Sequence, residues 1–234
     1  MDSWKSDGLA VVVGSSGGIG AAVIDALRQS GGFAEIVGFS RGSQPGLDLL
    51  DEQSIFEAAN TIKARQSELR LVFDATGFLH GDGLSPEKAL SAVTPDHLAH
   101  AFAVNTIGPA LLMKHFLPLL PRQGKSVFAS LSAKVGSIGD NQLGGWYSYR
   151  ASKAALNQLV HTAAIELARR RPEAVCVALH PGTVDTGLSS DFAKSGLSVQ
   201  QPADAAARLL SVLDRLTAAD TGGFFDYRGD PLPW

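Results

Sequence analysis

The segment 144–160, GGWYSYRASKAALNQLV, contains residue types and spacings that suit acid/base chemistry. Residues four apart share one face of a helix, which pairs Tyr149 with Lys153 and leaves Tyr147 with an alanine at that spacing. A free phenol has a pKa of roughly 10, and a neighbouring ammonium favours the phenolate and lowers that pKa. Arg150 could act on Tyr147 in this way, but a guanidinium does not exchange protons. We therefore expect Tyr149 to be the general acid/base and Lys153 to modulate it.

A glycine-rich turn, VVVGSSGGIGAAV, follows a short apolar run near the amino terminus. Gly14, Gly18 and Gly20 give the spacing G-x-x-x-G-x-G between a predicted strand and a predicted helix. Such glycines allow a tight turn, a close approach of the backbone to a diphosphate, and close packing of helix on strand. The free N–H groups of the helix end would then bind the phosphates. A turn without a ligand is the alternative, but the flanking strand and helix favour a nucleotide site.

The end of the second predicted strand, GFSRGSQPG, bears on the choice of nucleotide. Ser40 and Arg41 stand where an NAD-binding protein has an acid for the ribose hydroxyl. A serine can donate to a 2′-phosphate, and an arginine can bind it through paired charge-assisted bonds. The sequence thus predicts NADP(H) and makes NAD(H) the less favoured cofactor. An Arg41 that is merely solvated is the alternative.

Predicted strands and helices alternate along the whole chain. The helix that carries Asn105 begins with Thr94 as its N-cap and Pro95 at its first position. This alternation predicts a single-domain α/β Rossmann fold over residues 1–234, a doubly wound, mostly parallel sheet with helices on both faces. Apolar, β-branched runs of the kind found in strands covered on both faces lie at 9–14, 35–40, 69–75, 125–132, 174–180 and 222–227.

Composition and charge narrow the class of protein. The 234 residues are 45% hydrophobic and 18% charged, with a net charge of −3, which attracts neither nucleic acid nor an anionic membrane. No apolar stretch has the length of a signal peptide core or a bilayer span, so we expect a cytoplasmic protein. The one cysteine, Cys176, lies in an apolar run, as a buried thiol does. No His or Cys spacing indicates a metal site.

Four motifs together resemble the short-chain dehydrogenase/reductase family: the glycine turn, the Tyr149-x-x-x-Lys153 pair, Asn105 in a long helix, and HPGTVDT at 180–186. They occur in the order of that family and span essentially the whole chain. GSIGDNQLGGWYSYRASKAALN and the terminal DYRGDPLPW look most like its C-factor-like carbonyl reductase branch. The resemblance implies an oxidoreductase that reduces an aldehyde or ketone, or oxidises the matching alcohol. The alternative is a nucleotide-binding signalling or redox-sensor protein of the C-factor type with little turnover.

The resemblance also implies roles for individual residues. Asn105 would interrupt its helix and hold a water for proton relay to Lys153, and Lys153 would also bond the nicotinamide ribose. A simple helix kink before Gly108 is compatible with that role. The residues implied to hold the cofactor are Gly14, Ser15, Ser16, Gly18, Ile19, Gly20, Ser40, Arg41, Asp48, Leu49, Ala75, Thr76, Gly77, Lys153, Pro181, Gly182, Val184 and Thr186.

The serine that donates to the substrate carbonyl is less clear. The family places it three residues before a glycine, and Ala133 occupies that position before Gly136. We expect Ser132, at the strand end, to take the role by a small shift of its hydroxyl. Ser137 follows the glycine, and Ser130 points the same way as Ser132 but lies deeper in the strand. That none of these serines acts is the remaining alternative.

Two departures from the family are expected to be linked. Val13 stands where the family has threonine, and DATG at 74–77 stands where it has Asn-Asn-Ala-Gly. Replacing both members of a buried hydrogen-bonded pair by apolar groups can be nearly neutral. We therefore expect the side chains of Val13 and Ala75 to face each other.

The family fold also predicts where a substrate and a second subunit would bind. A small carbonyl or alcohol would lie over the carboxyl ends of the strands, and the short segment 187–201 suggests an open pocket. The helix from Tyr147 to Arg171 and the Asn105 helix are more apolar than one sheet-facing stripe requires. Family members pair these helices, which predicts a homodimer or homotetramer. The candidate pocket walls are Phe78, Leu79, His80, Leu143, Trp146, Tyr147, Thr183, Leu188 and Phe192.

Overall fold

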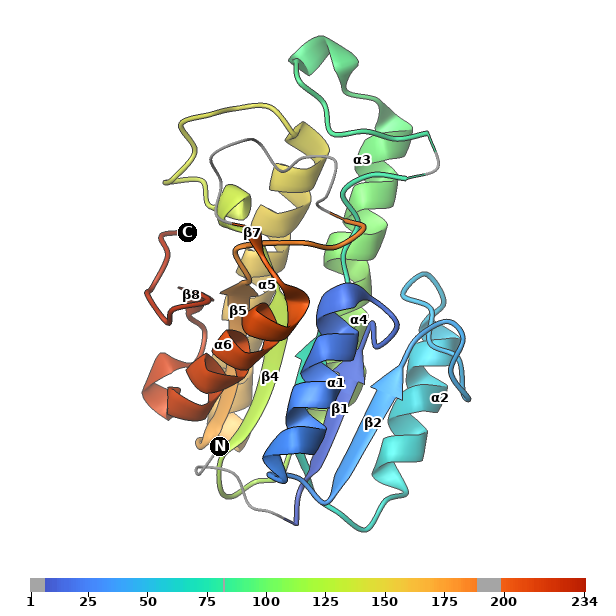
Figure 1. The fold of residues 1–234 in the computed structure, drawn as a ribbon, viewed down its shortest axis with the longest axis vertical. Helices are drawn as coiled ribbons and strands as arrows, with labels where there is room; N and C mark the ends of the chain where they lie inside the picture. Colours follow the sequence, from blue (N-terminus) through green and yellow to red (C-terminus); the bar gives the residue numbers. More distant parts are fainter. Residues whose placement is uncertain (1–6, 82, 189–198) are drawn as a thin grey trace.

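A six-stranded parallel sheet, in the order β2-β1-β3-β4-β5-β8, forms the centre of the computed structural model (Figure 1). The structure describes residues 7–81, 83–188 and 199–234. The strands are β1 (Leu9–Val13), β2 (Glu35–Phe39), β3 (Leu69–Asp74), β4 (Ser126–Leu131), β5 (Ala174–His180) and β8 (Phe224–Asp226), with a separate pair of β6 (Thr183–Val184) and β7 (Val199–Gln200). The predicted α/β Rossmann architecture is confirmed.

Helices cover both faces of the sheet. α1 and α6 share one apolar core with the sheet, and α2, α4 and α5 share the other (Figure 1). The helices are α1 (Gly18–Ser30), α2 (Glu52–Lys63), α3 (Pro95–Phe102), α4 (Gly108–Phe116), α5 (Tyr147–Arg170) and α6 (Pro202–Arg215), a π-helix (Ala103–Ile107) between α3 and α4, and short 3₁₀ turns at Leu90–Ala92, Leu117–Leu119, Lys134–Gly136 and Ala218–Asp220. Among the described residues, no helix is long and apolar enough to cross a membrane.

Two cores explain why the strands are apolar at consecutive positions. In β1, Leu9, Val11 and Val13 pack on the side of α2, α4 and α5, whereas Ala10 and Val12 pack on the side of α1 and α6. Side chains alternate between the faces of a strand, so a strand buried on both sides has no polar face. The same alternation buries Cys176 in the middle of β5, with none of its surface exposed.

Local signals fix several helix ends where the sequence places them. The hydroxyl of Thr94 accepts from the backbone N–H of His97, with Pro95 at the first position of α3. α1 ends at Gly31, whose φ of 62° is left-handed. Asp51 caps α2 by accepting from the N–H of Gln53.

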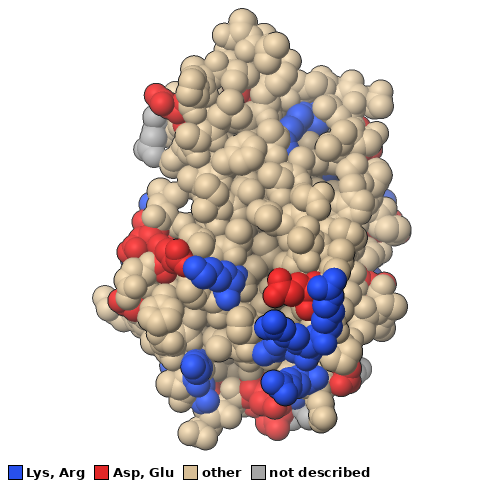
Figure 2. All heavy atoms as spheres, turned by 180° about the vertical axis from the view of Figure 1, so that it is seen from behind, with Lys and Arg blue, Asp and Glu red and all other residues tan. Residues whose placement is uncertain are grey.

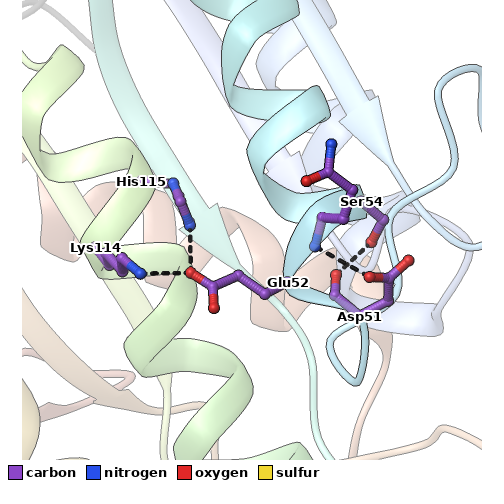
Figure 3. Close-up of polar contacts among 6 residues, drawn as sticks. Asp51, Glu52, Ser54, Lys114 and His115 are labelled. Atoms are coloured by element: carbon purple, nitrogen blue, oxygen red, sulfur yellow. Dashed lines mark hydrogen bonds and ion pairs between the residues drawn. The ribbon is translucent and has the colours of Figure 1, made fainter.

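A glutamate of α2 contacts a lysine and a histidine of α4 (Figure 3). One carboxylate oxygen of Glu52 accepts from Lys114 Nζ at 2.5 Å and contacts His115 Nε2 at 3.0 Å. Glu52 lies in the first turn of α2, where a negative charge also suits the positive helix end. Lys114 lies in the last turn of α4, where its positive charge suits the negative helix end.

The expected contact between Val13 and Ala75 is wrong. Val13 packs in the core shared with α2, α4 and α5, whereas Ala75 packs against the core on the other face. The register pairs Val13 with Asp74, and side chains alternate along the chain, so Ala75 points to the opposite side. Val13 and Ala75 therefore do not together replace a hydrogen-bonded pair of facing side chains.

Candidate active site

The turn from β1 to α1 is built as a site for an anionic group. Gly14 has a φ of 80°, and a Cβ there would lie 3.1 Å from the carbonyl carbon of Ala75. A Cβ on Gly20 would lie 2.2 Å from the Gly14 oxygen, so only glycine lets α1 start this close to the strand. The N-cap, Gly17, has no capping side chain, and the first turn of α1 contains no acid. The N–H groups at the positive helix end thus suit a diphosphate.

Residues 183–186, a second segment predicted to bind the cofactor, lie against the turn between β1 and α1. A Cβ on Gly18 would lie 2.8 Å from Thr186 Cγ2, which places residues 14–20 and 183–186 side by side. The Gln200 side chain donates to the Pro181 oxygen at 3.1 Å and steadies this segment. The structure thus brings together two stretches that are far apart in the sequence.

The end of β2 borders the same turn. The N–H groups of Gly14 and Ser15 donate to the Phe39 oxygen at 2.9 and 3.0 Å. Ser40 follows directly, and the side chain of Arg41 is exposed beyond it.

Leu49 and Asp48 take different places next to that turn. Leu49 is buried against α4, where a Cβ on Gly108 would lie 2.7 Å from Leu49 Cβ. Asp48 is partly exposed, and its carboxylate accepts from the N–H of Leu50 at 3.0 Å. Both lie beyond the end of β2.

Tyr149 and Lys153 lie on one face of α5, as their spacing predicts. Lys153 is almost fully buried, and its Nζ donates to the oxygen of Leu131, the last residue of β4, at 2.8 Å. A Cβ on Gly136 would lie 2.8 Å from Lys153 Cβ, so this glycine lets the 3₁₀ turn after β4 pack on the lysine stem. The ammonium is therefore fixed at the carboxyl end of the sheet.

Burial shifts the proton affinities of both groups. It raises the pKa of the half-buried Tyr149 phenol, which keeps its proton at neutral pH. This is opposite to the lowering expected from a neighbouring ammonium, because burial disfavours the charged phenolate. Burial lowers the pKa of Lys153 to about 8, although the Asp74 carboxylate opposes this. A tyrosine that holds its proton, one helical turn from a lysine whose pKa is lowered to about 8, suits proton delivery to a substrate.

Asp74 is a buried carboxylate that sequence analysis gave no role. Ser130 Oγ donates to its Oδ2 at 2.6 Å, and the N–H and hydroxyl of Thr76 donate to its Oδ1 at 3.0 and 2.5 Å. Burial raises the pKa of Asp74, and these bonds and the charge of Lys153 oppose the rise. The signal for it was present in the sequence, since an acid ends an otherwise apolar run in LVFDATG.

Asn105 joins the loop after β3 to α5. It is fully buried in the π-helix, and its side chain bonds both the N–H and the oxygen of Phe78, at 2.7 and 2.8 Å. Its Nδ2 also donates to Ser152 Oγ at 3.1 Å, and Ser152 donates to the Tyr149 oxygen at 2.9 Å. The helix is thus interrupted at Asn105, as the resemblance implied.

Gly77 places the backbone of the loop after β3 next to the side chains of Asn105 and Lys153. A Cβ there would lie 3.7 Å from Asn105 Oδ1, 3.7 Å from Lys153 Nζ and 3.9 Å from Leu188 Cδ2. The predicted cofactor segment 75–77 therefore borders the lysine and the asparagine.

The three candidate serines have different partners. Ser132 Oγ donates to Asn157 Oδ1 on α5 at 2.6 Å, one residue beyond the carbonyl that holds Lys153. Ser137 Oγ donates to the Trp234 oxygen at 3.4 Å and accepts from the Asp140 N–H. Ser130, as noted, donates to Asp74. Of the three, Ser132 directly follows the residue whose carbonyl holds Lys153.

The loop before α5 holds Trp146 beside the tyrosine. The Trp146 ring lies edge-on to Tyr149, with centroids 6.2 Å apart. Arg150 donates to the oxygens of Gly144 and Gly145, and also to that of Val135. This arginine therefore supports the loop rather than Tyr147.

The other predicted pocket residues are spread around this site. His80 Nε2 lies 3.2 Å from the Gly187 oxygen, which links two loops at the carboxyl end of the sheet. Leu79 is buried, whereas Leu143 is 87% exposed. Phe192 lies outside the described residues. In the described part of the chain, no group of three or more His, Cys, Asp or Glu gathers as a metal site would require.

Comparisons with known proteins identify the family. A family model described as Enoyl-(Acyl carrier protein) reductase matches residues 34–220. The chain is also 33% identical, over 192 residues, to 1-hydroxy-2-glutathionyl-2-methyl-3-butene dehydrogenase of Rhodococcus, an alignment that covers 82% of this chain and 80% of that protein. The chain belongs to the short-chain dehydrogenase/reductase family. This short-chain dehydrogenase/reductase is an NAD(P)-dependent oxidoreductase.

This short-chain dehydrogenase/reductase is also similar to the C-signal by sequence and to two carbonyl reductases of known structure. The C-signal of Myxococcus xanthus is 37% identical over 148 residues, 62% of this chain and 84% of that protein. Among solved structures, the NADPH-bound carbonyl reductase from chicken fatty liver matches with a TM-score of 0.84 and 26% identity, over 97% of this chain and 98% of that one. The carbonyl reductase Sniffer of D. melanogaster, at 23% identity and a TM-score of 0.82, shares the fold over 97% and 99% of the two chains.

Proposed function

We propose that this enzyme is an NADP(H)-dependent carbonyl reductase that reduces an aldehyde or ketone, or oxidises the matching alcohol, with Tyr149 as the general acid/base. The observation that carries the proposal is the placement of Lys153. Its buried ammonium is bonded to the end of β4, on the helix face that carries Tyr149, at the carboxyl edge where substrates of such sheets bind. The NADPH-bound carbonyl reductase of similar structure supports the choice of reaction and cofactor.

The residues of the turn and its neighbours fit the cofactor. The glycine turn and the uncapped start of α1 would hold the diphosphate, and Ser40 and Arg41 the 2′-phosphate. Asp48 and Leu49 would border the adenine, and residues 75–77 and 181–186 the nicotinamide half. When bound, NADP(H) supplies or accepts the hydride.

Tyr149, Lys153 and Ser132 divide the proton chemistry of carbonyl reduction. Tyr149 gives its proton to the carbonyl oxygen, and the positive charge of Lys153 stabilises the phenolate that is left. Ser132 donates a hydrogen bond to the same oxygen as it gains charge. Asn105 would order the solvent that returns a proton through Lys153, since its side chain and the lysine both border Gly77. In alcohol oxidation the same groups act in reverse.

A panel of aldehydes and ketones with NADPH tests the proposal directly. We expect at least one carbonyl to accelerate NADPH oxidation, measured as loss of nicotinamide absorbance. The alternative is a signalling or sensor protein with little turnover, to which the similarity to the C-signal gives a specific basis. Tight NADPH binding without oxidation by any carbonyl would favour that alternative.

Arg41→Ala is expected to weaken NADPH binding without weakening NADH binding. One charge-assisted contact to the 2′-phosphate contributes about 1.5–3 kcal/mol, a factor of about ten to over a hundred in affinity. Fluorescence titration with both cofactors measures this, with Arg28→Ala, an exposed arginine at the far end of α1, as the matched control. Equal dissociation constants for NADPH and NADH in the wild type would contradict the NADP(H) assignment.

The rate of carbonyl reduction should depend on pH through Lys153. Because burial lowers the pKa of this lysine to about 8, the ammonium is lost above that pH and the Tyr149 phenolate loses its stabilising charge. We expect kcat/KM for reduction to be level below about pH 8 and to fall above it. The negative charge of Asp74 raises the pKa of Lys153, so Asp74→Asn should start the fall at lower pH. If kcat/KM falls at the same pH in Asp74→Asn as in the wild type, the Asp74 carboxylate does not affect the pKa of Lys153.

The α4/α5 face is expected to form a subunit interface. Leu159 and Ala163 are only partly buried, and they line a hollow of about 440 Å³ between α4 and α5. Figure 2 shows the molecule from behind, with a largely uncharged surface and Lys and Arg gathered toward one end. Light scattering at micromolar concentration should show a dimer or tetramer, and Ala163→Glu should shift it toward monomer because an unpaired charge would be buried. A monomeric wild type would contradict this expectation.

A further inference from the structure

The start of α5, which carries Tyr149, has no capping side chain of its own. Its N-cap residue is Trp146, at φ 54° and ψ 44°, which makes no side-chain capping bond, and the first turn contains no acid. The first N–H groups of a helix have no partner within the helix, and an end without caps opens readily. Tyr149 is the third helical residue, so it lies within that first turn.

Glu87, from the loop after β3, caps this end from 61 residues away. Its Oε2 accepts from the N–H of Ser148 at 3.1 Å, and its Oε1 accepts from the Ser148 hydroxyl. Its backbone oxygen also accepts from the N–H of Trp146 at 2.5 Å. Glu87 and Ser148 are both buried. Glu87 thus holds both sides of the helix start, Trp146 through its backbone oxygen and Ser148 through its carboxylate, whose charge lies at the positive helix end.

His97 of α3 contacts the same carboxylate oxygen that accepts from the Ser148 hydroxyl. Its Nδ1 lies 3.1 Å from Glu87 Oε1, and the histidine is buried. Burial acts to raise the pKa of Glu87, but the bonds from Ser148 and the interaction with His97 outweigh it and leave the pKa below its ordinary value. Glu87 is therefore charged at neutral pH and fixed between two helices.

The same contacts lead to Asn105. The His97 ring lies edge-on to Phe78, with centroids 6.2 Å apart, and Asn105 bonds the Phe78 backbone. A continuous set of contacts therefore runs from the asparagine of the π-helix through Phe78, His97 and Glu87 to Ser148. It ends one residue before Tyr149, whereas Lys153 lies a full turn deeper in α5 and is held separately by β4.

We propose that Glu87 is a positioning residue whose carboxylate fixes the first turn of α5 and thereby the Tyr149 phenol relative to Lys153. The inference rests on the proposed role of Tyr149. Without the carboxylate, the first turn loses its cap and the phenol loses its fixed place, while the lysine and the nucleotide turn keep their own supports. The expected defect therefore lies in turnover and not in cofactor binding.

Glu87→Ala and Glu87→Gln test this by kinetics. A misplacement of about 1 Å in a catalytic group can cost about 10²-fold in rate, and we expect a loss of kcat of that order for Glu87→Ala. Glu87→Gln keeps an oxygen that can accept from the Ser148 N–H, so it should recover part of kcat. The dissociation constant for NADPH should stay unchanged in both variants. Glu57→Ala, which removes an exposed glutamate of α2, is the matched control with unchanged kcat.

Titration of the phenol gives a readout that does not depend on turnover. The chain has three tyrosines, so in a Tyr147→Phe/Tyr227→Phe background Tyr149 alone contributes phenolate absorbance. Burial raises the pKa of Tyr149, and opening of the first turn exposes the phenol to solvent. Glu87→Ala should therefore lower the titration midpoint toward the ordinary tyrosine value, roughly 10.

The outcomes separate this inference from the proposed function. A folded Glu87→Ala variant with unchanged kcat and an unchanged Tyr149 midpoint would overturn it, even if its melting temperature fell, because the carboxylate would then only stabilise the fold. If Glu87→Ala does not fold, a Glu87→Gln variant with wild-type kcat and midpoint would overturn it equally. A wild type without any carbonyl reductase activity would refute the proposed function, and the phenol titration would still test the role of Glu87.

Discussion

Tyr149→Phe is expected to reduce carbonyl-dependent NADPH oxidation by about 10²–10⁴-fold, the usual contribution of a positioned acid/base group. Phenylalanine keeps the ring and its edge-on contact with Trp146 and removes only the hydroxyl. The fold and the nucleotide turn should therefore be unaffected. Steady-state kinetics gives the loss of turnover, and fluorescence titration should show unchanged NADPH affinity.

Tyr147→Phe is the matched control for this prediction. The Tyr147 side chain is 37% exposed, and its neighbour Arg150 bonds the loop before α5 instead of the phenol. We expect this variant to keep most of its turnover. An inactive Tyr147→Phe variant together with an active Tyr149→Phe variant would show that Tyr147, and not Tyr149, is the general acid/base.

Ser132→Ala is expected to lower turnover by about 10²–10³-fold, as loss of a donor to a developing oxyanion does. Ser132 follows Leu131, whose carbonyl holds Lys153 at the carboxyl end of β4, the edge at which substrates of such sheets bind. Its present partner is Asn157 Oδ1, while the Asn157 Nδ2 is buried without a partner in the described chain. If the side-chain amide of Asn157 flips by 180°, its Nδ2 donates to Ser132 Oγ. The serine O–H is then available to the substrate.

Two variants make this second prediction specific. Ser137→Ala should retain turnover, because the Ser137 hydroxyl bonds the Trp234 backbone and not the site. Asn157→Asp removes the Nδ2 donor that would free the serine O–H. Its loss of turnover should therefore approach that of Ser132→Ala. A large loss in Ser137→Ala with none in Ser132→Ala would move the donor role to Ser137, and small losses in both would mean that no serine acts.

The sequence allowed the sheet, the helix ends and the nucleotide turn to be predicted because each depends on local signals. Glycine spacing, the Thr94-Pro95 cap and consecutive apolar residues act within a few positions of the chain. That Tyr149 and Lys153 share one face of α5 followed from helix periodicity in the same way. The register between strands has no such local signal, which is why Val13 was expected to face Ala75 and instead pairs with Asp74.

The site residues that were missed depend on contacts between distant segments. Glu87 lies in a stretch, SPEKALSAV, that resembles an ordinary polar loop, and nothing near it indicates that Ser148 is its partner. Asn157 lies one turn beyond Lys153 on the same face of α5, so helix spacing could have flagged it. Its bond to Ser132 depends on how α5 packs on β4, which no single segment determines.

The burial of Cys176 makes this protein convenient for site-specific labelling. It is the one cysteine of the chain, it has no exposed surface, and burial raises its pKa to about 12. Because the thiolate is the species that reacts with maleimides, the native thiol should be inert in the folded protein. A cysteine introduced at the exposed Leu143 would then take up a fluorophore or spin label without prior removal of Cys176. Such a probe would follow the loop before α5 during ligand binding, and labelling of Cys176 itself would count the unfolded molecules.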